Sequence, residues 1–237
     1  MFATVGMTSP ATRPFWVSVE GPEGVGKTHL ARRLASRLAS CQLLVELTDA
    51  EGEQVPTQVI AALASAGDRF LRTGHPLTET FALLALKTRE RELVQRMSSP
   101  PQIVLEDRGL DTVAIYQAAI LAGSDSDDDA VWSLAEHVFT TAAPWCPLPD
   151  LTVLLIEDLD VCAARWTMRE GTPFTTGQLA LVERATRLYR RLAEQQPDRV
   201  RTIDRSGHTE SQVLDELDTL IRQAASERGR RPHATAS

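Results

Sequence analysis

The run GPEGVGKT, at residues 21–28, has the residue types and the spacing of a phosphate-binding loop. It fits the pattern G-x-x-x-x-G-K-[ST], in which the glycines let the backbone wrap a phosphate and direct its N–H groups toward the oxygens. In such loops the lysine reaches the β- and γ-phosphates and the hydroxyl binds Mg²⁺. We therefore predict these roles for Lys27 and Thr28, within a set of ATP contacts that comprises Gly21, Glu23, Gly24, Val25, Gly26, Lys27, Thr28 and His29.

A companion carboxylate for Mg²⁺ is expected where a neighbouring buried strand ends. The apolar run IVL, at residues 103–105, is followed directly by Glu106, Asp107 and Arg108. An acid at such a position helps to hold the ion beside the phosphates. We predict that Asp107 contacts the metal, partly through water, with Glu106 as the second choice. The alternative is that an acid at this position only caps the next helix.

Phosphoryl transfer needs positive charge from several segments, because both substrates are anions. The candidate arginines are Arg89 in LKTRERE, Arg108 beside Asp107, and both Arg165 and Arg169 in ARWTMREG. The last stretch runs into a Gly/Thr/Pro segment, so a mobile lid is predicted at about residues 165–178. The chain lacks the guanine-binding pattern N-K-x-D, which favours a kinase over a GTPase.

Strands and helices alternate along the chain, so the phosphate loop lies between a strand and a helix. Apolar runs predict strands at 15–21, 42–47, 101–107, 150–158 and 199–204. Helical spacing predicts helices at 27–41, 57–66, 78–97, 112–123, 178–195 and 210–225. Such alternation indicates a three-layer α/β fold, in which helices flank a parallel five-stranded sheet.

Composition and charge narrow the class of protein. The chain has 237 residues, 43% of them hydrophobic, and a net charge of −7, which argues against binding to polymeric nucleic acid or to anionic membranes. The three cysteines are scattered, and neither a signal peptide nor a long apolar run is present, so we expect a cytoplasmic protein. We predict a single P-loop kinase domain at 14–225, with disordered tails at 1–13 and 226–237.

Between about Phe15 and Ala224 the sequence resembles the thymidylate kinase family. The run VEGPEGVGKTHLARRLASRL is similar to the start of that family, and CAARWTMREG is similar to its basic lid. The run LLALKTRE is similar to L-L-F-x-x-x-R, which places Arg89 at an arginine that contacts base or phosphate. EDRGLDTVAIYQ is similar to D-R-x-x-x-S-x-x-A-Y-Q, with matches at Asp107, Arg108, Tyr116 and Gln117 and with Thr112 in place of the serine.

The resemblance implies a three-layer P-loop kinase fold and Mg²⁺-dependent transfer of the ATP γ-phosphoryl group to an acceptor phosphate. It implies that Asp107 organises the metal and the acceptor, and that charge is stabilised by Lys27, Arg108, Arg165 and Arg169. Family variants without a basic residue in the P-loop carry catalytic arginine in the lid, and Glu23 together with the lid arginines matches that pattern. Relatives of this type commonly form homodimers through helices beside the sheet. The implied acceptor contacts are Arg89, Arg108, Thr112, Tyr116 and Gln117.

Two departures from the family leave the acceptor open. The stretch VELTDAEGEQV carries Glu46 but lacks the family's R-E-P-G-G-like motif, and Ala85 stands where an aromatic residue packs on the base. A (deoxy)nucleoside monophosphate or a similar nucleotide is the favoured acceptor, with Glu46 among its contacts. Alternatively, Glu46 is the general base for a nucleoside or another hydroxyl-bearing small molecule, as in deoxynucleoside kinases. The last alternative is a non-catalytic, regulatory NTP-binding protein.

Overall fold

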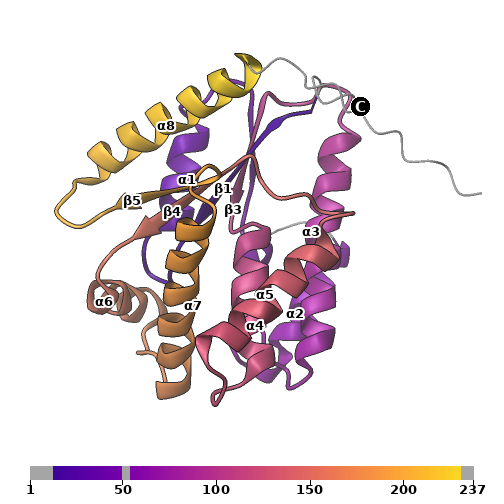
Figure 1. Cartoon of the computed structure of the whole chain (residues 1–237), viewed down its shortest axis with the longest axis vertical. Coiled ribbons are helices and arrows are strands. Elements are labelled where there is room, and N and C mark those ends of the chain that lie inside the picture. The colour runs from indigo at the N-terminus through magenta and orange to yellow at the C-terminus, as the bar shows by residue number, and fades with distance from the viewer. Residues whose placement is uncertain (1–12, 50–53, 231–237) are drawn as a thin grey trace, which may run out of the picture.

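The computed structural model, which describes residues 13–49 and 54–230, contains one parallel sheet of five strands. The strands are β1 (Phe15–Glu20), β2 (Cys41–Leu44), β3 (Ile103–Asp107), β4 (Leu151–Ile156) and β5 (Val200–Asp204). Their order in the sheet is β2-β3-β1-β4-β5, so β1 is the central strand (Figure 1). The predicted α/β class and five-stranded parallel sheet are thus confirmed.

Helices cover both faces of this sheet and complete the three layers (Figure 1). One face packs against α1 (Lys27–Ala35) and α8 (Glu210–Arg230). The other face packs against α4 (Leu110–Ala122) and α7 (Thr176–Gln195), with α5 (Asp128–Ala142) beside them. A further apolar cluster joins α2 (Gln54–Leu63) and α3 (Pro76–Gln95) to α4. The remaining helices are α6 (Leu159–Glu170) and the short 3₁₀ helices η1 (Leu47–Asp49) and η2 (Ala64–Ala66).

The alternation of side chains along β1 separates an apolar face from a polar one. Val17 and Val19 are fully buried in the cluster beneath α1 and α8. Ser18 and Glu20 are also fully buried, but successive strand residues point to opposite faces, so they lie on the side of α4 and α7. A buried carboxylate requires hydrogen-bond partners. Glu20 therefore marks a polar centre inside the domain, next to the phosphate loop.

Several element boundaries differ from those predicted. Strand β2 ends at Leu44, three residues before the predicted end, and the chain continues into η1. The predicted lid spans the end of α6, the connection 171–175 and the start of α7. Helix α7 begins with a capping box, because the side chains of Thr175 and Gln178 each accept from the other's backbone N–H. No helix in the described part of the chain is long and apolar enough to cross a membrane.

The ordered domain extends beyond both of the predicted boundaries. Arg13, assigned to the N-terminal tail, lies 2.6 Å from a carboxylate oxygen of Asp150. Helix α8 continues past residue 225 to Arg230, and Arg228 lies 2.9 Å from the other Asp150 oxygen. The predicted boundaries at 13 and 226 are wrong because Asp150, distant in sequence, binds an arginine from each end. The predicted tail residues 1–12 and 231–237 lie outside the described residues.

A buried ion pair joins the start of α4 to strands β4 and β5, and it supports a stability prediction. Asp111 is fully buried and lies 2.8 Å from Nη1 of Arg199. It also accepts a 2.5 Å hydrogen bond from Thr152. Replacing Arg199 with methionine leaves this carboxylate without its charged partner. We expect a loss of about 3 kcal/mol in the free energy of unfolding.

Urea denaturation of Arg199→Met, beside the wild-type chain, measures this loss. The matched control is Arg190→Met, because Arg190 is an exposed arginine of α7 and its replacement should change the stability by less than about 0.5 kcal/mol. Equal midpoints for the two variants would show that the pair to Asp111 contributes nothing.

Candidate active site

The phosphate loop connects β1 to α1, and its shape depends on two glycines. A Cβ added to Gly24 would overlap with the carbonyl oxygen of Cys162 in α6. Gly26, at the N-cap of α1, has a φ of 93°, which L side chains rarely adopt. Lys27 is buried, and its Nζ donates 2.8 Å hydrogen bonds to the carbonyls of Gly21 and Pro22. Burial, followed by the nearby Arg108 charge, lowers the pKa of Lys27.

The carboxylate predicted for Mg²⁺ lies beside this loop. Asp107 ends β3 opposite Val19 of β1, and its charge acts on Lys27. Its side chain is buried, and Oδ1 has no hydrogen-bond partner among the described residues. A buried oxygen of this kind fits a ligand for an ion or for a metal-bound water. In the described part of the chain, no three His, Cys, Asp or Glu side chains are grouped to hold a metal. An ion beside Asp107 and Thr28 therefore needs oxygens from phosphate and water as well.

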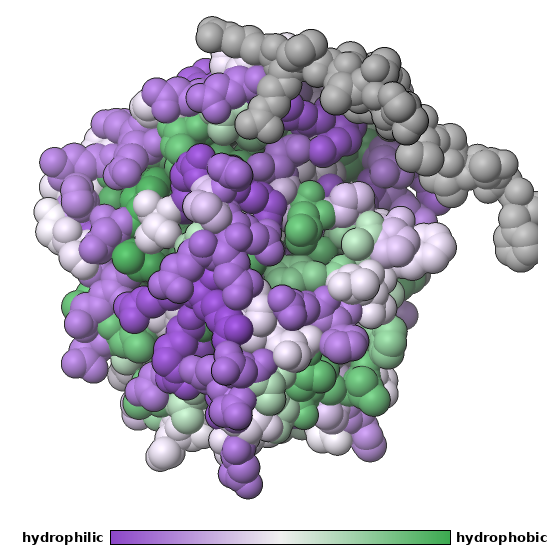
Figure 2. All heavy atoms as spheres, in the orientation of Figure 1, coloured by the Kyte–Doolittle hydropathy of each residue, from purple (hydrophilic) through white to green (hydrophobic). Residues whose placement is uncertain are grey.

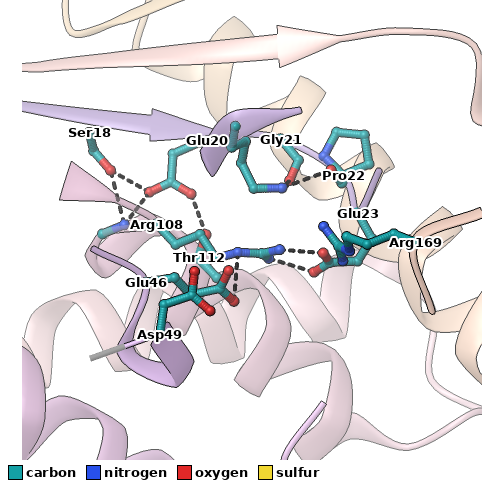
Figure 3. Close-up of polar contacts among 12 residues, drawn as sticks. Ser18, Glu20, Gly21, Pro22, Glu23, Glu46, Asp49, Arg108, Thr112 and Arg169 are labelled. Carbon is teal, nitrogen blue, oxygen red and sulfur yellow. Dashed lines mark hydrogen bonds and ion pairs between the residues drawn. The ribbon is translucent and has the colours of Figure 1, made fainter. Parts of the chain in front are cut away.

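Arg108 lies at the centre of the site, between two carboxylates (Figure 3). Its two terminal nitrogens donate to the two oxygens of Glu23, and its Nε lies 3.0 Å from Glu46. Burial alone would raise the pKa of Glu23, but the charges of Arg108 and Lys27 outweigh it and lower the pKa to about 2. Arg108 has a φ of 66°, a strained conformation for a residue other than glycine. The ion pairs hold the arginine in this conformation.

Glu20 organises the polar centre beside the loop (Figure 3). It accepts hydrogen bonds from Ser18 at 2.5 Å and from the backbone N–H of Gly109 at 2.7 Å. Thr112 and Tyr189 donate to its other oxygen. Burial, followed by the charge of Asp111, raises the pKa of Glu20. Glu20 is not among the residues predicted from the sequence, although its place at the end of a buried strand, directly before the first loop glycine, is a usable signal.

A cleft of about 900 Å³ brings the predicted donor residues together. Both lid arginines face it from α6. Arg165 lies 3.3 Å from Glu157, and the Arg169 guanidinium lies 5.1 Å from the Trp166 ring. Their side chains are about half exposed, at 42% and 56%, so they can change position when phosphates bind. The residues predicted from the sequence that line this cleft are Glu23, Gly24, Gly26, Lys27, Thr28, His29, Glu46, Arg108, Arg165 and Arg169.

His29 lies at the edge of the cleft, where α1 meets α8. Its Nε2 is 2.9 Å from Glu210 of α8, and 61% of the side chain is exposed. The imidazole is thus engaged with α8, so the predicted contact between His29 and ATP stays a prediction. Val25, also predicted from the loop pattern, buries its side chain completely beneath the loop, so only its backbone can face a phosphate.

A smaller pocket of about 90 Å³ adjoins the cleft. The pockets share Arg108, Glu23, Glu46 and Phe70. The predicted acceptor residues Thr112, Tyr116 and Gln117 all line the smaller one. Gln117 accepts a 3.0 Å hydrogen bond from Thr80, which orients its amide. The Tyr116 hydroxyl is buried without a partner among the described residues.

The structure corrects the predicted register of α3. Arg89 and Ala85 line a separate pocket of about 420 Å³ between α2 and α3, whereas Leu83 and Lys87 line the pocket beside Arg108. The prediction of Arg89 as an acceptor contact is wrong in this structure, because residues two apart on a helix do not share a face. Lys87 is almost fully buried and lies 2.9 Å from Glu90. Burial opposes its charge, but Glu90 and Glu106 outweigh this effect and raise the pKa of Lys87.

A row of aromatic rings lies between the loop before α3 and helices α4 and α6. Phe70, from the loop before α3, stacks on Tyr116 with ring centroids 5.8 Å apart. Its other neighbour is Trp166 of α6, at 6.2 Å and an interplanar angle of 11°. Trp166 in turn stacks on Phe174 at 4.6 Å. Phe70 lies in a loop without periodicity, so the sequence carried no signal for its place in the pocket.

Comparisons with known proteins agree with this geometry. The family model described as Thymidylate kinase matches residues 19–216. A thymidylate kinase from Caulobacter vibrioides is 30% identical over 219 residues, which cover 90% of this chain and 98% of that protein. One from Thermomicrobium roseum is 31% identical over 195 residues, covering 80% and 86%.

Solved structures show the same fold. The thymidylate kinase from Candida albicans aligns with a TM-score of 0.64 at 17% identity, covering 92% of this chain and 94% of that one. The enzyme from Ehrlichia chaffeensis aligns with a TM-score of 0.57 at 18% identity, covering 89% and 99%. The chain therefore belongs to the thymidylate kinase family, and it is an ATP-dependent kinase that phosphorylates a nucleoside monophosphate.

Proposed function

We propose that the acceptor is thymidine 5′-monophosphate and that the product is the diphosphate. The observation that carries this proposal is the pocket of Phe70, Tyr116 and Gln117, which meets the phosphate cleft at Arg108. A planar base can stack on the aromatic rings and bond to the amide. The names of the relatives from Caulobacter vibrioides and Thermomicrobium roseum support the same acceptor.

Positive charge from two sides of the cleft would stabilise the transferred phosphoryl group. Lys27 reaches the β- and γ-phosphates once its ammonium exchanges the carbonyls of Gly21 and Pro22 for phosphate oxygens. Arg165 and Arg169 approach from the lid, where they face the same cleft. Arg108 lies where the cleft and the smaller pocket meet, so it serves the acceptor phosphate. In this arrangement Glu23 holds Arg108 in place through its two hydrogen bonds.

Thr28 and Asp107 are the residues that would hold Mg²⁺, with part of the Asp107 contact through water. The buried, unpartnered Oδ1 of Asp107 supports this assignment. Bound there, the ion neutralises charge on the phosphates. Asp107 is kept in position by the pairing of β3 with β1.

We propose that two copies of the chain associate through α2 and α3. This surface exposes apolar side chains, with exposed fractions of 57% for Val55, 63% for Leu77 and 58% for Phe81. Val55 lines the pocket that also contains Ala85 and Arg89, and Phe81 lies four residues before Ala85 on the same helix. By contrast, hydrophilic residues cover α7 (Figure 2), and ion pairs join that helix to α5. Contiguous apolar surface favours an interface, whereas a charged face favours solvent.

Lys27→Ala tests the phosphate loop. We expect kcat/KM for thymidine 5′-monophosphate to fall at least about 100-fold, because a cation that stabilises the transferred group is lost. A coupled assay of ADP release with Mg·ATP measures this, with other nucleoside monophosphates and thymidine as alternative acceptors. Turnover with thymidine alone would overturn the monophosphate acceptor and favour Glu46 as a base. Full activity of the alanine variant would remove Lys27 from the mechanism.

Phe70→Leu tests the aromatic platform. We expect KM for the acceptor to rise about tenfold, because stacking on the base is weakened, while KM for ATP changes less. Phe70→Tyr keeps the ring and should stay close to wild type. The control is Trp145→Leu, since Trp145 is 72% exposed and does not belong to the aromatic row. An unchanged acceptor KM in Phe70→Leu would exclude the platform.

Phe81→Asp tests the interface. Placing a charge on the proposed contact should convert a dimer into a monomer, which light scattering after size-exclusion chromatography reports as a halved mass. The matched control, Leu179→Asp, alters a residue of α7 that is 37% exposed and should leave the dimer intact. A wild-type chain that is monomeric throughout a concentration series would refute the proposal.

A further inference from the structure

Arg205 lies against the phosphate loop. It follows β5, and its backbone N–H donates a 2.9 Å hydrogen bond to the carbonyl of Ile156 at the end of β4. Its Nη1 donates to the carbonyl oxygen of Val25 in the loop. A Cβ added to Gly26 would lie only 2.5 Å from the same Nη1. The guanidinium is therefore in contact with the peptide that joins Val25 to Gly26.

That peptide carries two polar groups, the Val25 carbonyl and the Gly26 N–H. In a trans peptide the C=O and the N–H point to opposite sides. Because Arg205 holds the Val25 carbonyl, the Gly26 N–H points away from the guanidinium. Gly26 lines the cleft that also contains Lys27 and Thr28. The N–H is thus directed to the place where loops of this type bind phosphate.

Glycine gives this peptide unusual freedom to rotate. Gly24 and Gly26 flank Val25 and both have positive φ, at 79° and 93°. A flip of the peptide would exchange the positions of the carbonyl and the N–H, and it would place a carbonyl oxygen next to the phosphates. A charged hydrogen bond to the carbonyl opposes this flip and also polarises the N–H on the other end.

We propose that Arg205 is a positioning residue for the ATP phosphates, acting through the Val25–Gly26 peptide. Unlike Arg165 and Arg169, it is attached to the sheet, and it holds the loop before the nucleotide binds. The inference rests on the proposed donor site. Burial, followed by the neighbouring charge of Arg165, lowers the pKa of Arg205, and this charge repulsion is consistent with a site that binds an anion.

The environment of Arg205 includes two acids, Glu157 and, with a smaller influence, Glu210 of α8. Glu157 faces it from the loop after β4, but that carboxylate also lies 3.3 Å from Arg165 and accepts a 3.3 Å hydrogen bond from Ser206. The terminal nitrogen of Arg205 is directed to the loop carbonyl. The Arg205 hydrogen bond therefore holds the loop, whereas Glu157 pairs with Arg165.

The test compares Arg205→Met, Arg205→Lys and Arg205→Gln. Calorimetric titration with Mg·ADP gives the Kd, and steady-state kinetics give the two KM values. We expect the methionine variant to weaken Mg·ADP binding and to raise KM for ATP about tenfold, the scale of one charged hydrogen bond. The acceptor KM should stay within about twofold. Lysine and glutamine can each donate to the carbonyl, so we expect both to recover part of the affinity.

The matched control is Arg201→Met, four residues earlier and exposed on β5, which should bind Mg·ADP as the wild type does. Lys27→Ala must also lose Mg·ADP affinity; if it does not, the donor site itself is misplaced. If Lys27→Ala loses affinity while Arg205→Met binds normally, the inference about Arg205 is overturned. If Arg205→Met does not fold, the folded Arg205→Gln and Arg205→Lys variants take its place. An acceptor KM that rises as much as the ATP KM in either variant would also overturn the inference.

Discussion

The ion pair between Glu23 and Arg108 links the two pockets of this kinase. Glu23 belongs to the phosphate loop, and Arg108 directly follows the neighbouring strand β3. Both side chains are largely buried, and removing one would take from the other its closest charged partner. The loop, strand β3 and the start of α4 are thereby tied into one unit, on which the position of both substrates depends.

The site contains cations with different freedom of movement. Lys27 and Arg108 are buried and held by carbonyls or carboxylates, whereas the lid arginines are half exposed. ATP and a nucleoside monophosphate are both anions and repel each other when they meet in one cleft, and fixed cations alone would keep the empty site strongly charged. The acids Glu23 and Glu46 reduce that charge in the absence of substrate. The half-exposed Arg165 and Arg169 are cations of the cleft that are free to move.

Residues next to strand ends were the predictable part of the site. Asp107 ends one strand, and the loop that carries Lys27 and Thr28 follows another, so their place at one edge of a parallel sheet follows from the fold class. It is harder to predict which residues of α3 line the pocket, because charged residues occur on several faces of that helix. The sequence favours Arg89, whereas Lys87 lines the pocket in the structure. The sequence does not predict the roles of Phe70 and Arg205, because each acts through a contact with a distant segment. The same reason explains the extent of α8, which Arg228 and Asp150 help to hold.

The contact between Gly24 and Cys162 affects how the lid can move. Cys162 lies in the first half of α6, and its carbonyl abuts the phosphate loop so closely that no side chain fits between them. That part of the helix cannot swing inward without displacing the loop. Arg165 and Arg169 lie progressively farther from this contact along the helix, so a small tilt there moves Arg169 more than Arg165. The contact with the phosphate loop is thus the pivot point of helix α6. When the helix tilts, Arg169, which lies beside the aromatic row, moves farther than Arg165.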